Sequence, residues 1–111
     1  MRLPALETER AETFLETGLE YREGEPVRVR LRKRGRRFDL RDDGCAVELA
    51  GRPEGWRELA VRLVERELWL NVSRDGVVFV PAVEGGLDLS RLAERVAEAS
   101  LALYQELLDL E

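Results

Sequence analysis

Apolar and basic residues alternate one for one between Val27 and Arg32. Valine or leucine occupies each odd position of this segment, and arginine occupies each even position. Because successive side chains of a β-strand point to opposite faces of its sheet, this period of two predicts a half-buried strand. One face of the strand is expected to be apolar and to build the core, while the other face carries the charge.

The residues that follow are expected to extend this strand into an antiparallel meander. Arg34-Gly35 is a turn candidate, because glycine adopts the positive φ that a tight hairpin needs. Phe38 and Leu40 face inward and alternate with charged residues, which predicts a second strand. Asp42-Asp43-Gly44 predicts another hairpin turn, and residues 45–49 continue the apolar alternation as a third strand.

Other local signals predict three helices and a second hairpin. These elements are a helix at residues 4–17 that stops at Gly18, a helix from Trp56 to Glu67, a hairpin of residues 68–72 and 77–80, and a helix from Asp88 to about Leu110. The resulting order is α-βββ-α-ββ-α. We therefore expect a single α+β domain over residues 1–111, with helices packed on one antiparallel sheet.

Composition restricts the functions that this chain can serve. It has 111 residues, no histidine and one cysteine. Without histidine it lacks the commonest general base and the commonest metal ligand, so we expect no enzymatic activity, no metal site and no cofactor. One cysteine cannot form an internal disulfide, and neither a membrane span nor the apolar core of a signal peptide is present in the sequence. A cytoplasmic bacterial protein is expected.

Positive charge is concentrated in one segment of an acidic protein. Residues 28–41 hold eight of the eighteen basic residues and one acid, while the whole chain carries a net charge of −5. Arginines on one strand face and around the adjoining turn could meet phosphates or a row of carboxylates. The candidate anion-binding residues are Arg28, Arg30, Arg32, Arg34, Arg36 and Arg37.

Nucleic acid is nevertheless a disfavoured partner for these arginines. Proteins that bind nucleic acid usually combine a basic net charge with exposed aromatic rings, whereas this chain is acidic and Phe38 is expected inside. The field of the whole molecule would also repel a polyanion. The arginines are instead expected to form a solvated face and to pair with acids such as Asp39 and Glu48. An acidic surface, this protein's own included, is the favoured counterpart.

The acidic turns and the cysteine do not indicate catalysis or metal binding. Asp42-Asp43-Gly44 and Arg74-Asp75-Gly76 lack the further oxygen ligands of a calcium loop, and Asp-Gly is a favoured hairpin turn without any further role. Cys45 is in phase with Val47 and Leu49, so it is expected in the core. No histidine is present to activate its thiol.

An excess of apolar residues is the strongest functional signal. The C-terminal helix needs an apolar face of only ~100°, yet residues 99–104 are almost wholly apolar. Trp69 points away from the apolar face of its own strand. A helix covered on two sides would explain this pattern, and so would a homodimer or a bound partner. The candidate partner-binding residues are Trp69, Leu101 and Tyr104.

Residues 38–110 resemble the type III secretion chaperones and their chaperone-like bacterial relatives. The likeness consists of a hairpin, the helix from Trp56, the Leu-Trp-Leu-Asn-Val hairpin and the long closing helix in a small acidic chain. Such proteins are typically dimers that hold an extended segment of another protein on apolar grooves, which is what the resemblance implies here. The strand ending Arg-Phe-Asp-Leu-Arg-Asp-Asp-Gly also looks like a bacterial and phage-associated domain of unknown function, which implies no activity.

The expected function is therefore that of a small non-enzymatic protein-binding module, chaperone- or adaptor-like, which acts as a homodimer. Its expected partners are a second copy of itself and a segment of another protein. Anion or nucleic-acid binding through the Arg-rich first hairpin is the alternative.

Overall fold

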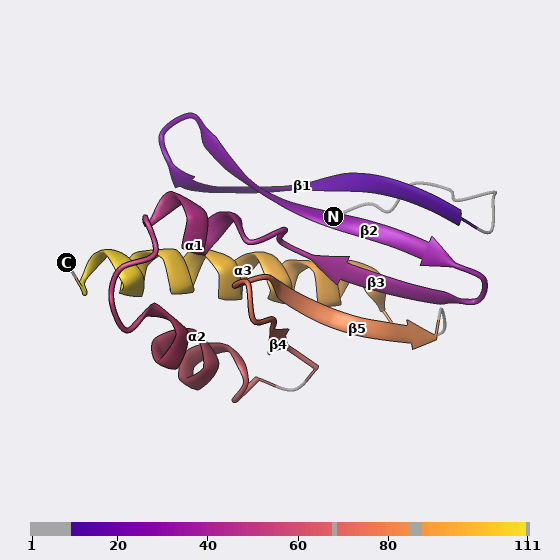
Figure 1. The fold of residues 1–111 in the computed structure, drawn as a ribbon. Coiled ribbons are helices and arrows are strands. Elements are labelled where there is room, and N and C mark those ends of the chain that lie inside the picture. The colour runs from indigo at the N-terminus through magenta and orange to yellow at the C-terminus, as the bar shows by residue number, and fades with distance from the viewer. Residues whose placement is uncertain (1–9, 68, 85–87, 111) are drawn as a thin grey trace.

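The computed structural model describes residues 10–110 except residue 68 and residues 85–87. These residues form a five-stranded antiparallel sheet with three helices, and the long C-terminal helix packs on the sheet (Figure 1), so the α+β class is confirmed. The strands lie side by side in the order β1-β2-β3-β5-β4. The elements are β1 (Arg10–Arg22), β2 (Glu25–Arg34), β3 (Arg37–Arg41), α1 (Cys45–Leu49), α2 (Trp56–Val64), β4 (Asn71–Val72), β5 (Val78–Glu84) and α3 (Leu89–Leu108).

The alternating segment forms the central part of strand β2, as predicted. Val27, Val29 and Leu31 are at most 1% exposed. The arginines between them point to the opposite face of the sheet. A turn at Gly35, where φ is 61°, connects β2 to β3. Phe38 of β3 is half-buried and packs against the core, which confirms its inward orientation.

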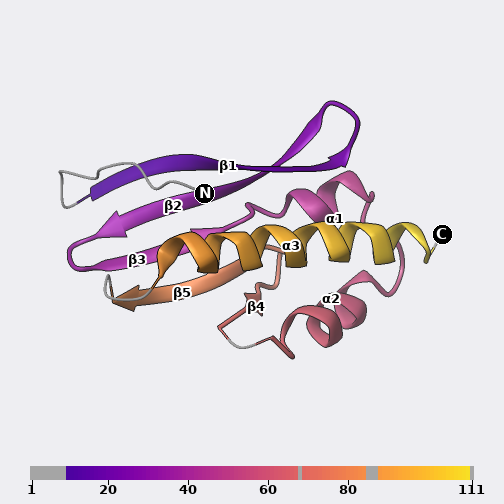
Figure 2. The ribbon, with the colours of Figure 1, turned by 180° about the vertical axis from the view of Figure 1, so that it is seen from behind.

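Helix α3 covers the apolar face of the sheet. It contacts β1, β2, β3 and β5, and it lies behind the strands in Figure 1 and in front of them in the reverse view of Figure 2. The backbone N–H of Arg91 donates a 3.1 Å hydrogen bond to Oδ1 of Asp88, which confirms the predicted N-cap. Helices α1 and α2 contact α3 past the ends of β3 and β5, and none of the described helices lies over the second, charged face of the sheet (Figures 1 and 2).

The expected N-terminal helix is wrong for residues 10–17, which belong to strand β1. Leu15 is 4% exposed, whereas the adjacent Phe14 is 52% exposed on the other face of the strand. Strand β2 offers backbone donors and acceptors along this whole segment, and such tertiary pairing overrides local helix propensity. Gly18, the expected helix stop, has φ 79° where the β1–β2 register shifts. Residues 4–9 lie outside the described residues.

The expected third strand at residues 45–49 is also wrong, because these residues form the short helix α1. Gly44 precedes this helix with φ 79°, and its N–H donates a 2.8 Å hydrogen bond to Oδ1 of Asp42. The chain turns back at this point, and β5 pairs with the edge of β3 that the third strand would have used. Cys45 is exposed on α1 rather than buried in the core, and Ala46 and Val47 are buried instead.

Helix α2 and the second hairpin are confirmed, with α2 and β4 shorter and β5 longer than expected. Helix α2 ends at Val64, and strand β4 contains only two residues. Trp69 lies in a turn before β4 and not in a strand. None of the helices in the described part of the chain has the length and hydropathy of a membrane span.

Candidate functional site

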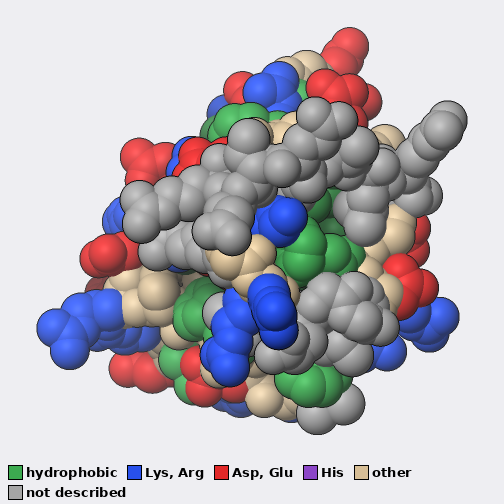
Figure 3. Space-filling model, turned by 90° about the vertical axis from the view of Figure 1, so that its right-hand side faces the viewer, with side chains coloured by type: hydrophobic (Ala, Val, Ile, Leu, Met, Phe, Trp, Pro, Cys, Tyr) green, Lys and Arg blue, Asp and Glu red, His purple; other side chains and the backbone are tan. Residues whose placement is uncertain are grey.

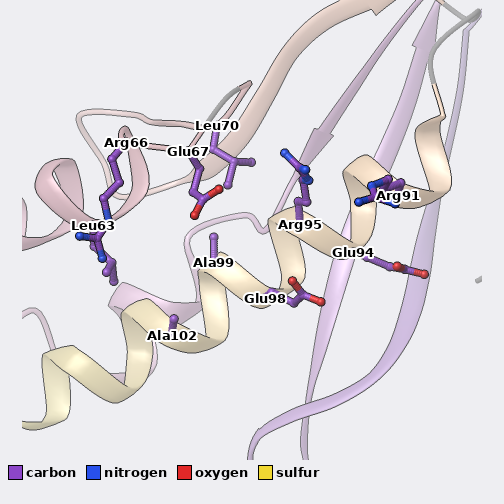
Figure 4. A pocket seen from close by; sticks show the side chains of 10 residues that line it. All are labelled: Leu63, Arg66, Glu67, Leu70, Arg91, Glu94, Arg95, Glu98, Ala99 and Ala102. Carbon is purple, nitrogen blue, oxygen red and sulfur yellow. The ribbon is translucent and has the colours of Figure 1, made fainter.

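A groove of about 600 Å³ lies between helices α2 and α3. One wall comes from the end of α2 and the turn before β4, and the other comes from the outer face of α3 (Figure 4). The groove is lined by Leu63, Arg66, Glu67, Leu70, Arg91, Glu94, Arg95, Glu98, Ala99 and Ala102.

The groove combines a small apolar surface with charges of both signs. Leu63 and Leu70 face Ala99 and Ala102 across it, and the carboxylate of Glu67 points toward α3 between them (Figure 4). Three arginines and three glutamates complete the lining, so the groove has no net charge. Because the side chains of Ala99 and Ala102 are short, a segment in the groove could approach the α3 backbone closely. Such a surface suits an apolar segment with mixed charges better than a polyanion.

Trp69 lies in the turn that forms one wall of the groove. Its side chain is 44% exposed, whereas the neighbouring Leu70 is 4% exposed. Its φ is 75°, a left-handed conformation that costs roughly 1–2 kcal/mol for a residue other than glycine. A 3.2 Å hydrogen bond from Leu70 N–H to the carbonyl of Glu67 closes the turn. The fold therefore holds a large aromatic side chain in solvent at an energetic cost, and strain of this kind tends to occur at functional sites.

The other two predicted partner-binding residues are placed differently. Leu101 is half-buried and packs against the core. Tyr104 is 4% exposed, and its ring packs edge-on against Tyr21 with the centroids 5.5 Å apart. Tyr104 is therefore a core residue in the folded chain and not a surface residue. The groove uses Ala99 and Ala102 instead, and the wide apolar stripe of residues 99–104 was the sequence signal for them.

The structure divides the six candidate anion-binding arginines between two places. Arg28, Arg30 and Arg32 lie on the open face of β2, whereas Arg36 and Arg37 are exposed at the β2–β3 turn. The side chain of Arg34 lies outside the described residues. In the view toward the turn end of the sheet, basic side chains appear in separate groups with acidic and hydrophobic ones between them (Figure 3).

Two of the arginines on the open face are paired with the protein's own carboxylates, as the sequence suggested. Nε and Nη2 of Arg32 donate hydrogen bonds of 3.0 and 3.1 Å to the two oxygens of Asp39. This bond raises the pKa of Arg32 above its ordinary value. Nε of Arg30 lies 3.0 Å from Oδ2 of Asp43, and both arginines lie 3.9 Å from Glu12. Glu48, the other expected partner, pairs instead with Arg52 at 3.3 Å.

The Asp-Asp-Gly turn contains a buried carboxylate that the sequence did not reveal. Asp42 is 1% exposed, and burial raises the pKa of its carboxyl to about 6. Asp42 does not line the groove between α2 and α3, and it does not line a second cavity near Cys45. A catalytic acid or base must contact a substrate, and the Asp42 carboxyl is enclosed in the interior. Its raised pKa therefore reflects its structural environment and does not indicate a catalytic role.

Cys45 opens onto a second cavity, of about 320 Å³, near Tyr21 and Asp43. Burial raises the pKa of the Cys45 thiol, and the nearby carboxylates of Asp42 and Asp43 raise it further. A raised pKa reduces the fraction of thiolate, which is the reactive form. No cluster of three or more metal-ligating side chains occurs within the described residues.

No protein-family model matches the sequence, and comparison with curated proteins and with solved structures also finds no match.

Proposed function

We propose that this protein is a non-enzymatic protein-binding module that holds a segment of another protein in the groove between α2 and α3. The observation that carries the proposal is the groove itself, with an apolar centre, balanced charges at its walls and a strained, exposed Trp69 next to the lining residue Leu70. Aromatic side chains that remain exposed beside a groove are common anchors in protein interfaces.

A homodimer is part of this proposal. Val61 of α2 and Leu108 and Leu110 near the end of α3 are each more than 40% exposed. A second copy of the chain would remove these apolar side chains from water. Light scattering at micromolar concentration should then give the mass of a dimer, and Leu108→Glu should shift it toward the monomer. A monomer at every concentration would remove the homodimer from the proposal.

The alternative function needs the six candidate arginines to form one anion-binding surface. The carboxylates of Asp39 and Asp43 already neutralise Arg32 and Arg30, and Arg28 lies on the open face of β2 whereas Arg36 and Arg37 lie at the β2–β3 turn. The six arginines do not form one surface, so anion binding is less well supported than protein binding in the groove.

The groove is tested by peptide selection. We expect the wild-type protein to select peptides with apolar residues from a random displayed library. Ala102→Arg places a long charged side chain in the groove and should weaken their binding about ten-fold or more, a loss of about 1.4 kcal/mol. Gln105→Arg is the matched control, because Gln105 is exposed on the same helix and does not line the groove. Equal binding by both variants, or no selection at all, would exclude the groove as the site.

A further inference from the structure

The open face of the sheet contains a row of four side chains that crosses four strands. Phe14 of β1 pairs with Arg30 of β2, Arg30 pairs with Arg41 of β3, and Arg41 pairs with Phe79 of β5. Directly paired residues point to the same face, so two aromatic rings flank two guanidinium groups on a line across the sheet. Three strand spacings of about 4.8 Å separate the two phenylalanine backbones by roughly 14 Å.

Among the described residues, only Arg30 of the two arginines in this row is paired with a carboxylate. Like charges directly opposite each other on adjacent strands repel. The ion pair with Asp43 reduces this repulsion at Arg30, but within the described part of the chain Arg41 has no ion pair. Nε of Arg41 is buried without a hydrogen-bond partner among the described residues, and a buried donor left in this state requires an explanation. Both observations indicate that an anion at the terminal nitrogens of Arg30 and Arg41 would stabilise the row.

The rings define what kind of anion fits. Phe14 is 52% exposed and Phe79 is half-buried. The guanidinium carbon of Arg30 lies 5.2 Å from the centroid of the Phe14 ring, a cation–π contact that orients the ring beside the charge. A ligand that combines planar rings with a phosphate between them matches the order ring, cation, cation, ring. Single-stranded nucleic acid has this chemistry, because its unpaired bases stack on aromatic side chains while its phosphates contact arginine.

The net charge of −5 does not prevent such a local contact. At an ionic strength of 0.1 M, charges farther away than a Debye length of about 10 Å are largely screened. The row itself contains two cations and no acid, although Asp43 and Glu12 lie within 4 Å of Arg30 and Arg41 is therefore the main cation for a ligand. The distant acids therefore reduce the association rate more than they weaken a short contact.

We propose that the row Phe14–Arg30–Arg41–Phe79 is a binding site for a short stretch of single-stranded nucleic acid, with bases on the two rings and phosphates on the two arginines. This site lies on the sheet face opposite α3 and is independent of the groove. It differs from the predicted basic hairpin, since Arg41, Phe14 and Phe79 do not belong to that set.

The test measures fluorescence anisotropy of a labelled single-stranded oligothymidylate at low salt. We expect binding that weakens with salt with a logarithmic slope of about −1.4, because two phosphate contacts contribute about −0.7 each. Phe14→Leu and Phe79→Leu should each weaken binding about 5- to 100-fold, the loss of one stacked base. Arg41→Gln should also weaken it and flatten the salt slope. Arg36→Gln is the control, because Arg36 is exposed at the turn and lies outside the row.

Further arms of the same experiment separate the possible ligands. A duplex of the same sequence should bind more weakly than the single strand, since its bases are not free to stack. Circular dichroism spectra identical to that of the wild type would show that the variants fold. The proposal is overturned if the wild type does not bind the oligonucleotide, or if Arg36→Gln weakens binding as much as Arg41→Gln. It is also overturned if inorganic phosphate or an acidic peptide competes as well as unlabelled oligonucleotide.

Discussion

The hydroxyl of Ser100 donates a 2.6 Å hydrogen bond to Oδ2 of Asp42, although the two residues are 58 positions apart in the sequence. Oδ1 of the same carboxylate accepts 2.8 Å hydrogen bonds from the backbone N–H groups of Gly44 and Val78. Because the Ser100 proton is directed at Asp42, the Tyr21 hydroxyl donates the 2.6 Å bond that joins it to Ser100. One buried carboxylate thus connects the end of β3, the start of β5, helix α3 and strand β1.

Asp42 is expected to make the folded protein less stable as the pH rises through about 6. Burial raises the pKa of this carboxyl from 3.8 to about 6, although its hydrogen bonds favour the ionised form. The folded state therefore binds the proton more tightly than the unfolded state. The resulting stabilisation is complete below about pH 4 and is lost as the pH rises through about 6. At 1.36 kcal/mol for each pKa unit, the change is about 3 kcal/mol.

Asp42→Asn should remove this contribution to the pH dependence. The asparagine oxygen can accept from Gly44 and Val78, and its NH₂ group can donate to Ser100. Denaturant titrations between about pH 4 and pH 7 give the free energy of unfolding at each pH. Asp75→Asn is the control, because Asp75 is exposed. A wild-type pH slope retained in Asp42→Asn would show that another group titrates.

Ser100→Ala should destabilise the protein by about 2 kcal/mol, because it leaves the Asp42 carboxylate and the Tyr21 hydroxyl without their shared partner. Tyr21→Phe removes one hydroxyl and leaves the bond from Ser100 to Asp42, so its cost should be smaller, about 1 kcal/mol. Thermal and denaturant unfolding of both variants would measure the difference. A larger loss for Tyr21→Phe would contradict the order of bonds described above.

Arg32→Lys should cost about 1 kcal/mol of stability, because lysine cannot form the two parallel hydrogen bonds that Arg32 makes with Asp39. Arg28→Lys is the matched control, since Arg28 lies on the same face of the same strand and is exposed. It should change the free energy of unfolding by a few tenths of a kcal/mol at most. Equal effects of the two substitutions would mean that the Arg32–Asp39 pair adds nothing to stability.

Gly76→Ala should destabilise the protein far more than Gly24→Ala. Both glycines have positive φ, 91° and 84°, so alanine costs roughly 1–2 kcal/mol at either position. At Gly76 a Cβ atom would also lie 2.9 Å from Cγ2 of Val47 and 3.2 Å from Cζ3 of Trp56, whereas nothing lies within 4 Å at Gly24. This overpacking should add about 1–3 kcal/mol. Similar unfolding midpoints for the two variants would contradict the close packing of α1 and α2 on this turn.

The sequence predicted those elements whose signal is local. The alternation in β2, the apolar spacing in α2 and the cap at Asp88 each depend on residues a few positions apart, and each was confirmed. Strand β1 was missed because Phe14 and Leu15 are adjacent and fit a helix as well as a strand. Its state depends on hydrogen bonds to β2, which no local pattern contains.

The candidate sites were predictable to a smaller extent. Trp69 was expected to be exposed because it points away from its apolar neighbours, and the structure agrees. Tyr104 was misplaced because a wide apolar stripe does not show which of its members face the sheet. The row from Phe14 to Phe79 could not be predicted, because it depends on the register of four strands. The role of Asp42 likewise depends on Ser100, which approaches it only in the folded chain.

The position of α3 in the chain has a consequence for synthesis. All five strands precede this helix in the sequence, yet it is the element that covers the apolar face of Val27, Val29 and Leu31. A ribosome that has translated as far as Glu84 has made all five of the described strands, but the cover for that face has not been synthesised. The nascent chain must therefore remain uncollapsed or be shielded until residues 89–108 emerge, and this interval is when it is most exposed to aggregation.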